Sequence, residues 1–127
     1  MTETKAEPGT PGIIGWTDLT VEDAETIRDF YAAVVGWKPE ACDMGGYSDF
    51  IMTAPTSGTA VTGICHKRGS NASMPSQWMV YINVEDIATS IERCRELGGE
   101  VLVDVRNTPG QGSLCVIRDP AGAVAAL

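Results

Sequence analysis

Six side chains suited to holding a small molecule occupy matching positions in the two halves of the sequence, three in each half. They are Trp16, Asp18 and Thr20 in the first half and, 63 positions later, Met79, Tyr81 and Asn83. An aromatic ring and a thioether give apolar contact, while an acid, a phenol, a hydroxyl and an amide can fix a ligand's orientation. Because every second residue of a strand points the same way, each set of three is a candidate ligand-facing surface.

Asp18 is the acid among these six side chains, and it has three interpretations. A carboxylate half-buried beside an aromatic ring has a raised pKa, as a general base needs. It could equally be the counter-ion of a bound cation, or simply accept hydrogen bonds from neighbouring backbone. Gln111, between Gly110 and Gly112, adds a ligand-binding candidate on an exposed rim. Gly63 within a strand indicates the close approach of a backbone or a ligand.

The cysteines and the single histidine are weaker candidates for chemistry. The four cysteines, at positions 42, 65, 94 and 115, form no C-x-x-C pair. Cys65 and His66 are neighbours on a strand, so their side chains point to opposite faces and are not expected to form a nucleophile–base couple. A single histidine does not make a metal site, and at a strand end it is usually a surface or hydrogen-bonding residue.

The elements that position the first set are a strand and the helix that follows it. Residues 13–21 alternate so that Leu19 and Val21 form a core face opposite Asp18. Asp23 is a suitable N-cap for a helix over 24–35. Its apolar residues recur as one helical stripe, which we expect to pack on the core. The stripe consists of Ile27, Phe30, Tyr31, Val34 and Val35. Gly36 is expected to end the helix in a left-handed conformation.

The second half repeats this plan. Val84-Glu-Asp86 repeats Val21-Glu-Asp23, and Gly99 repeats Gly36, at the same offset of 63 residues. We therefore predict a second strand over 77–84 and a second helix over 87–97. Each helix is followed by three short strands, which gives a strand, a helix and three strands twice. The organisation is a flexible tail over 1–12, then one domain whose modules cover 13–66 and 77–127.

Composition limits the possible partners. The chain has 127 residues, enough for one domain, and a net charge of −8. Nucleic acid is not an expected partner, because its binding needs clustered Lys and Arg. Neither is a membrane, since no run approaches the ~20 apolar residues of a span. The start of the sequence lacks the apolar stretch of a signal peptide, so we expect a cytoplasmic protein with reduced thiols.

The duplicated plan, together with three short motifs, resembles the vicinal oxygen chelate superfamily, which holds glyoxalase I, the bleomycin resistance proteins and the extradiol dioxygenases. The motifs are Phe30-Tyr31, Gly36-Trp37 and the late Asp119-Pro-Ala-Gly122. The resemblance implies an α+β fold in which two tandem βαβββ modules form a cupped mixed sheet around a cavity, usually in a homodimer. It also implies that the six candidate side chains face one another across that cavity, within one chain or between two.

The metal-dependent members of that superfamily place one ligand on the first and last strands of each module. The matching positions here hold Trp16, Met79 and Ala126, and residues 53–76 contain no Asp or Glu that could supply the fourth ligand. None of these side chains is a ligand for a hard metal ion. We therefore expect no metal and no other cofactor, and no chemistry that depends on them.

Three hypotheses about function follow from this comparison. The first is a metal-free small-molecule-binding protein of the bleomycin resistance type, which sequesters a cationic or aromatic compound. The second is an atypical lyase, isomerase or dioxygenase-like enzyme on the same fold, with Asp18 as its acid–base. The third is a structural partner that has lost its ligand site. Turnover of a substrate would separate the second from the first, and a ligand would exclude the third.

Overall fold

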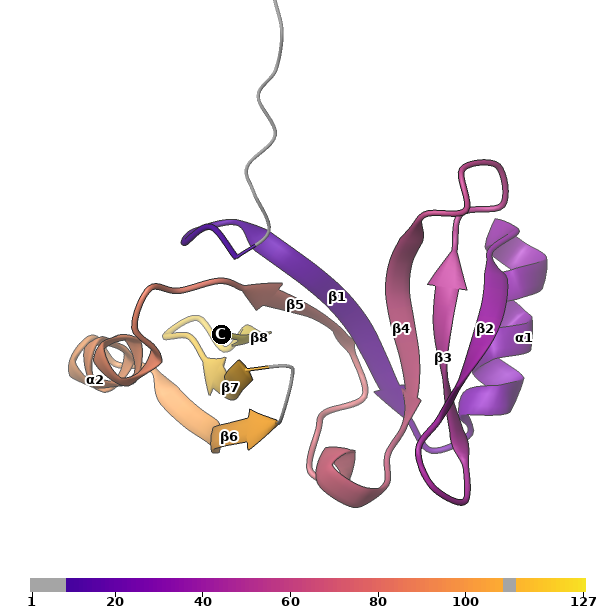
Figure 1. Cartoon of the computed structure of the whole chain (residues 1–127). Helices are drawn as coiled ribbons and strands as arrows, with labels where there is room; N and C mark the ends of the chain where they lie inside the picture. The colour runs from indigo at the N-terminus through magenta and orange to yellow at the C-terminus, as the bar shows by residue number, and fades with distance from the viewer. Residues whose placement is uncertain (1–8, 109–111) are drawn as a thin grey trace, which may run out of the picture. The chain divides into compact units, whose positions relative to one another are not determined.

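A computed structural model describes residues 9–108 and 112–127 and has an α+β fold built from two βαβββ modules. Module one contains β1 (Ile14–Val21), α1 (Ala24–Val35), β2 (Lys38–Asp43), β3 (Ser48–Thr53) and β4 (Ala60–His66). Module two contains β5 (Trp78–Ile82), α2 (Ile87–Glu96), β6 (Glu100–Thr108), β7 (Gly112–Arg118) and β8 (Val124–Ala126). A short 3₁₀ turn (Gly69–Asn71) lies on the connection (Figure 1). The predicted order of elements and both helices are confirmed.

The chain divides into two compact units, which are described separately. One comprises residues 16–78, and the other comprises residues 79–127 with the described residues before Trp16. The first unit therefore holds nearly all of module one together with Trp78. The second holds most of module two.

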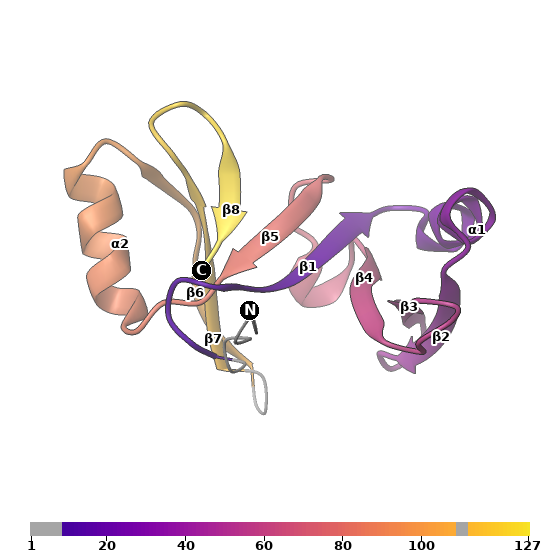
Figure 2. The same ribbon diagram turned by 90° about the horizontal axis from the view of Figure 1, so that it is seen from above.

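In module one the strands lie in the order β2-β3-β4-β1, with β1 and β4 parallel and the other pairs antiparallel. α1 packs on one face of these strands, as both views of the ribbon show (Figures 1 and 2). The core between helix and sheet consists of Ala24, Phe50, Met52 and Ile64, all nearly inaccessible to solvent. Burial of such side chains from water is the main stabilising contribution to a small domain.

Both ends of α1 have the predicted caps. The Asp23 carboxylate accepts a hydrogen bond from the Thr26 backbone N–H at 3.3 Å, which satisfies one free donor of the first turn. Gly36 has a φ of 87°, and its backbone N–H donates to the Ala32 carbonyl at 3.0 Å. Only glycine adopts this left-handed conformation at little cost, so the chain can leave the helix here and return as β2.

The predicted apolar stripe of α1 is wrong in part. Ile27 and Tyr31 pack against the core, but Phe30 remains 53% exposed and Val34 65% exposed. The reason is geometric, because consecutive helical residues are about 100° apart and a flat sheet contacts only a narrow arc of the helix. Ala24, Ile27 and Tyr31 occupy that arc, whereas the other apolar residues lie on its flank.

In module two the order is β5-β8-β7-β6, with β5 and β8 parallel and the remaining pairs antiparallel. α2 contacts β6 and β7 and runs beside them (Figure 2). Its first turn is capped by Asp86, whose carboxylate accepts from the Ala88 N–H at 3.1 Å and the Thr89 hydroxyl at 2.9 Å. Among the helices of the described residues, neither is long and apolar enough to cross a bilayer.

The end of β5 differs from the prediction. β5 ends at Ile82, two residues before the expected end, because the Asn83 backbone turns to a different partner. Its N–H donates to the Ile13 carbonyl at 2.9 Å, and its carbonyl accepts from the Gly12 N–H at 2.7 Å. β6 extends to Thr108 and carries two irregularities in its pairing with β7. At the edge of the module-one strand order, β2 is exposed along its whole length and contains Pro39.

Candidate functional site

β1 positions the first set of candidate residues on the face of the module-one sheet that points away from α1. In its parallel pairing with β4, Leu19 lies opposite Ile64, which belongs to the core beneath the helix. Asp18 lies opposite Gly63 in the same ladder, one residue out of phase, and therefore on the other face. Trp16 and Asp18 are half-buried, whereas Thr20 is buried. The alternation predicted for β1 is confirmed.

Gly63 lies beside the Asp18 side chain and has no side chain of its own. A Cβ atom placed on Gly63 would lie 3.4 Å from the Asp18 Cβ and 3.8 Å from the Cys65 Sγ. Glycine therefore provides bare backbone beside the carboxylate, which is consistent with the close approach expected from the sequence. Thr20 lies opposite Cys65, so the hydroxyl, the thiol and the carboxylate share one face.

The surroundings of Cys65 show the electrostatic character of this face. Burial raises the pKa of the Cys65 thiol, and the negative charges of Asp18 and Asp49 raise it further. A thiol with this pKa is protonated at neutral pH and is a poor nucleophile. Asp18 places a carboxylate beside this thiol, and a carboxylate on this face favours a bound cation over an anion.

The second set of candidates lies in the other compact unit. Met79 is buried, and Tyr81 on β5 lies opposite Ala126 on β8. The Asn83 side chain packs on Gly15, where an added Cβ would approach the Asn83 Nδ2 to 2.8 Å. Asn83 therefore has a structural role in holding the segment before β1. Gln111 lies outside the described residues.

The metal-ligand positions of the superfamily offer no donor set. Trp16 and Met79 lie on the first strands of the two modules as predicted, and Ala126 is fully buried on β8. In the part of the chain that the structure describes, no group of three or more His, Cys, Asp or Glu side chains could hold a metal ion. An indole, a thioether and a methyl group do not suit a hard divalent ion. The residues present therefore do not fit the metal of the metal-dependent members.

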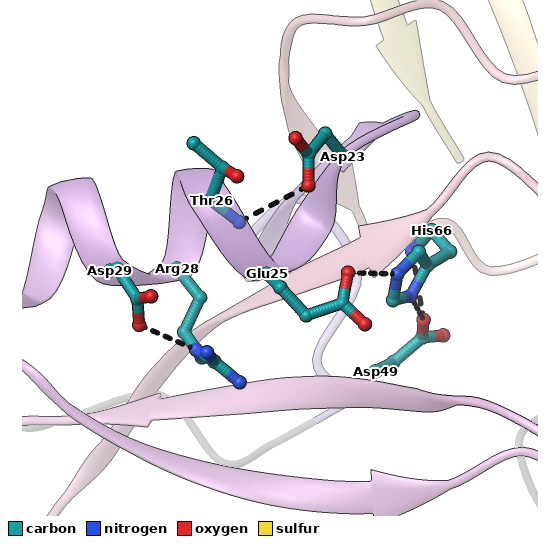
Figure 3. Close-up of polar contacts among 7 residues, drawn as sticks. All are labelled: Asp23, Glu25, Thr26, Arg28, Asp29, Asp49 and His66. Carbon is teal, nitrogen blue, oxygen red and sulfur yellow. Dashed lines mark hydrogen bonds and ion pairs between the residues drawn. The ribbon is translucent and has the colours of Figure 1, made fainter.

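The structure reveals a cluster that sequence reasoning missed, with His66 between two carboxylates (Figure 3). The His66 Nε2 lies 2.8 Å from the Glu25 Oε2, and the His66 Nδ1 lies 3.3 Å from the Asp49 Oδ1. The same Asp49 oxygen accepts from the His66 backbone N–H at 2.8 Å. The three residues come from the first turn of α1, the start of β3 and the end of β4. The sequence marks this cluster only by its single histidine. Its acidic partners lie 41 and 17 residues away, so no local pattern connects them to His66.

The hydrogen bonds within this cluster determine the protonation states of His66 and Glu25. Burial opposes the imidazolium form of His66, but the hydrogen bonds to Glu25 and Asp49 outweigh it and the His66 pKa is raised. The hydrogen bond from His66 lowers the pKa of Glu25. Carboxylates can only accept, so an imidazolium that donates from both nitrogens satisfies both partners. With both nitrogens engaged, His66 connects α1 to the sheet and has no free nitrogen for a substrate.

A pocket of about 380 Å³ lies in the same unit, at the opposite end of α1 from His66. It is lined by Thr17, Tyr31, Trp37, Val61, Thr62 and Trp78. Neither Tyr31 nor Trp37 is among the ligand-binding residues predicted from the sequence. In the sequence, Tyr31 belongs to the predicted apolar stripe of the helix, and Trp37 counts only as part of a family motif.

The sequence is similar to a known protein family and to proteins within it. Residues 13–127 match the family model described as the Glyoxalase/Bleomycin resistance protein/Dioxygenase superfamily. The anthracycline biosynthesis protein DauV of Streptomyces sp. (strain C5) is 32% identical over 118 residues, which cover 91% of this chain and 40% of DauV. The chain thus spans about two fifths of the length of this relative.

Solved structures agree with the fold. A protein from Staphylococcus aureus superposes with a TM-score of 0.52 at 18% identity, covering 91% of this chain and 96% of that one. Methylmalonyl-CoA epimerase from Mycobacterium tuberculosis superposes with a TM-score of 0.51 at 16% identity, covering 91% and 88%. At these identities the likeness concerns the fold alone.

Proposed function

This chain belongs to the glyoxalase/bleomycin resistance protein/dioxygenase superfamily, and on that premise we propose that it is a small-molecule-binding protein that works without a metal ion. The ligand is a cationic or aromatic compound, held on the face of β1 that carries Trp16, Asp18 and Thr20. The negative character of this face is the observation that supports the proposal most. The Asp18 carboxylate raises the pKa of the neighbouring Cys65 thiol and lies beside the bare backbone of Gly63.

The chemistry of these residues suits a cation with an apolar body. A carboxylate in a partly desolvated place interacts more strongly with a bound cation than one in water, because the local dielectric constant is lower. The half-buried Trp16 ring on the same face offers apolar area and, to a cation, the negative face of its π system. The net charge of −8 also attracts cations towards the molecule as a whole.

The donor set supports the metal-independent part of the proposal. The side chains at Trp16, Met79 and Ala126 would have to change before a hard metal ion could bind as it does in the metal-dependent members. DauV is named for anthracycline biosynthesis, so anthracyclines belong in the ligand screen. The shared length is two fifths of that relative, and the activity of the whole relative is not transferred.

The test compares ligand binding by the wild type and three variants. Asp18→Asn is isosteric and should keep the fold while weakening a cationic ligand by about 1.5–3 kcal/mol, the range for a hydrogen bond to a charged group. Trp16→Ala should weaken charged and neutral ligands alike, because it removes buried apolar area. Glu92→Gln, on the exposed surface of α2, removes the same charge elsewhere and should leave affinity unchanged. A thermal-shift screen followed by calorimetric titration gives the affinities.

The other hypotheses predict different results in the same experiment. Equal affinity in the wild type, Asp18→Asn and Trp16→Ala would exclude this face as the site. Conversion of a bound compound, lost in Asp18→Asn, would favour the enzyme in which Asp18 acts as acid–base. An absence of stabilisation by any compound class would favour the structural-partner hypothesis.

A further inference from the structure

The 380 Å³ pocket of module one lies on the α1 side of the sheet and is therefore separate from the Asp18 face. Thr17 on β1 and Thr62 on β4 face this side, and their hydroxyl oxygens are 3.1 Å apart. Asp18 is the next residue along β1 and points to the other face. The pocket volume falls in the range of roughly 300–1,000 Å³ that is typical of small-molecule sites.

Three aromatic rings form the walls of this pocket. The ring centroids of Tyr31 and Trp37 are 5.8 Å apart, those of Tyr31 and Trp78 are 5.2 Å apart, and those of Trp37 and Trp78 are 6.0 Å apart. Trp78 is inclined at 81° to Tyr31 and 73° to Trp37, whereas those two rings are only 31° apart. The rings therefore make two walls that meet nearly at a right angle. A flat ligand can stack on one wall while its edge meets the other, which are the two favourable aromatic geometries.

A hydrogen bond fixes this corner. The Trp78 Nε1 donates to the Tyr31 hydroxyl oxygen at 3.1 Å. Because Tyr31 accepts this bond, its own hydroxyl hydrogen remains to be donated to another group. The corner is thus held before a ligand arrives, which reduces the entropy lost on binding. Trp78 is 38% exposed, so the outer wall is open to solvent.

The threonine hydroxyls at the base of the pocket act as acceptors. Thr62 donates its hydroxyl hydrogen to the Thr17 backbone carbonyl at 2.8 Å, and Thr17 donates its hydroxyl hydrogen to the Thr62 hydroxyl oxygen. Both hydrogens are committed, whereas the Thr17 hydroxyl oxygen retains its lone pairs. A ligand that reaches this base must donate a hydrogen bond. The six lining side chains carry no charge, so the pocket does not compensate an ionised ligand.

From these walls and this base we propose that the pocket binds neutral aromatic alcohols. The ring system of the ligand stacks in the corner made by Tyr31, Trp37 and Trp78, and its hydroxyl group donates to the Thr17 hydroxyl oxygen. This site goes beyond the function proposed for the Asp18 face, because it uses the other side of the sheet and discriminates by hydrogen bonding and stacking instead of charge.

The experiment uses two probes that differ in a single hydrogen-bond donor. 2-Naphthol can donate to Thr17, while 2-methoxynaphthalene has the same ring system and cannot. Calorimetric titration of the full chain should give an affinity about fivefold higher for 2-naphthol, the size expected for one neutral hydrogen bond. Thr17→Val should remove that preference and leave the weaker affinity. Trp78→Ala should weaken both probes by about tenfold or more, because it removes one aromatic wall.

Two controls keep the outcome specific. Glu92→Gln lies on the exposed surface of α2 and should leave both affinities unchanged. Val61→Trp enlarges a partly exposed lining residue at the edge of the pocket and should block both probes, which tests the same pocket if Trp78→Ala does not fold. Failure of wild type to bind 2-naphthol, equal affinity for the two probes, or full affinity in Val61→Trp would overturn the proposal. Binding of 2-naphthol that is lost in Asp18→Asn and kept in Val61→Trp would do the same, while leaving the proposed function of the Asp18 face intact.

Discussion

His66 is held by carboxylates from two different elements, and the pH dependence of that contact can be derived from its pKa shifts. The His66 pKa is raised in the folded state. The contact therefore contributes its full stability below the ordinary histidine pKa of about 6.5, and loses it as the pH rises through the folded value. The Glu25 pKa is lowered. Its contribution is present above the ordinary glutamate value and is lost as the pH falls through the folded one.

These signs predict a bell-shaped effect for Glu25→Gln. The wild type should exceed this variant in free energy of unfolding by the largest amount between roughly pH 4.5 and 6.5. The difference should decline on both sides, because on one side His66 loses its proton and on the other Glu25 gains one. Urea unfolding across the acid-to-alkaline range measures it, with Glu92→Gln on α2 as the control for loss of a charge. A difference that stays constant with pH would show that the ion pair does not contribute.

The sequence could not predict this cluster. A histidine at a strand end is expected to be a surface or hydrogen-bonding residue. His66 is buried and makes hydrogen bonds. The partners of His66 depend on where α1 starts relative to β3 and β4, which is determined by tertiary packing and not by nearby sequence. The alternation of β1 is different, because the period of a strand is local. That period alone correctly predicted that Asp18 and Leu19 lie on opposite faces of the sheet.

At the scale of the elements, the two glycines at matching positions after the helices have different roles. Gly36 has a φ of 87°, and a Cβ there would meet nothing within 4 Å. Gly99 would place a Cβ 2.6 Å from the Cys94 Sγ and 3.1 Å from the Arg118 carbonyl oxygen. The left-handed glycine after α2 is Gly98, with a φ of 93°. Gly36 is thus required for backbone conformation, whereas Gly99 is required for space.

Alanine substitutions should separate these two causes. Gly36→Ala should cost about 1 kcal/mol, the strain of a left-handed residue that has a side chain. Gly99→Ala should cost about 1–3 kcal/mol through overpacking. Adding Cys94→Ala should restore part of the loss in Gly99→Ala, since it removes the closest contact, and none of the loss in Gly36→Ala. Chemical denaturation of the wild type, Cys94→Ala, the two glycine variants and the two double variants checks this. An equal response of the two glycine variants to Cys94→Ala would contradict it.

The apolar stripe of α1 shows where element-level prediction stops. Periodicity identified the helix and both caps, because these depend on residues close in sequence. It also assigned Phe30 and Val34 to the core, and they are exposed. Periodicity reports which residues share a side of a helix, but the width of the contact is set by the surface that the helix meets.

At the scale of the whole molecule, the residues at the superfamily's metal-ligand positions predict that the purified protein carries no stoichiometric divalent metal. The reason is the chemistry of Trp16, Met79 and Ala126, which are unsuited to hard ions. Elemental analysis of protein prepared without chelators should give Ni, Zn, Fe and Mn far below one equivalent per chain. A metal-dependent member of the superfamily prepared in the same way is the control. One tightly held ion per chain would contradict the prediction and direct attention to His66, Asp18 and Asp49.

The duplication at an offset of 63 residues predicted the order of all the elements in both modules. It could do so because each module repeats the same local signals, namely an alternating strand, an acidic N-cap and a terminal glycine. The aromatic pocket was not predicted, because Trp78 reaches Tyr31 across 47 residues. Local signals determine the elements, whereas a pocket depends on which of them come together.

The exposed strand β2 also affects how this protein behaves at high concentration. A strand at the end of a sheet presents unpaired backbone groups, to which a strand of another molecule can add and begin an aggregate. β2 carries Pro39, which lacks the amide hydrogen that such a strand would need, and its side chains include Lys38, Glu40 and Asp43. The free edge of module one therefore carries features that oppose the addition of a strand from another molecule.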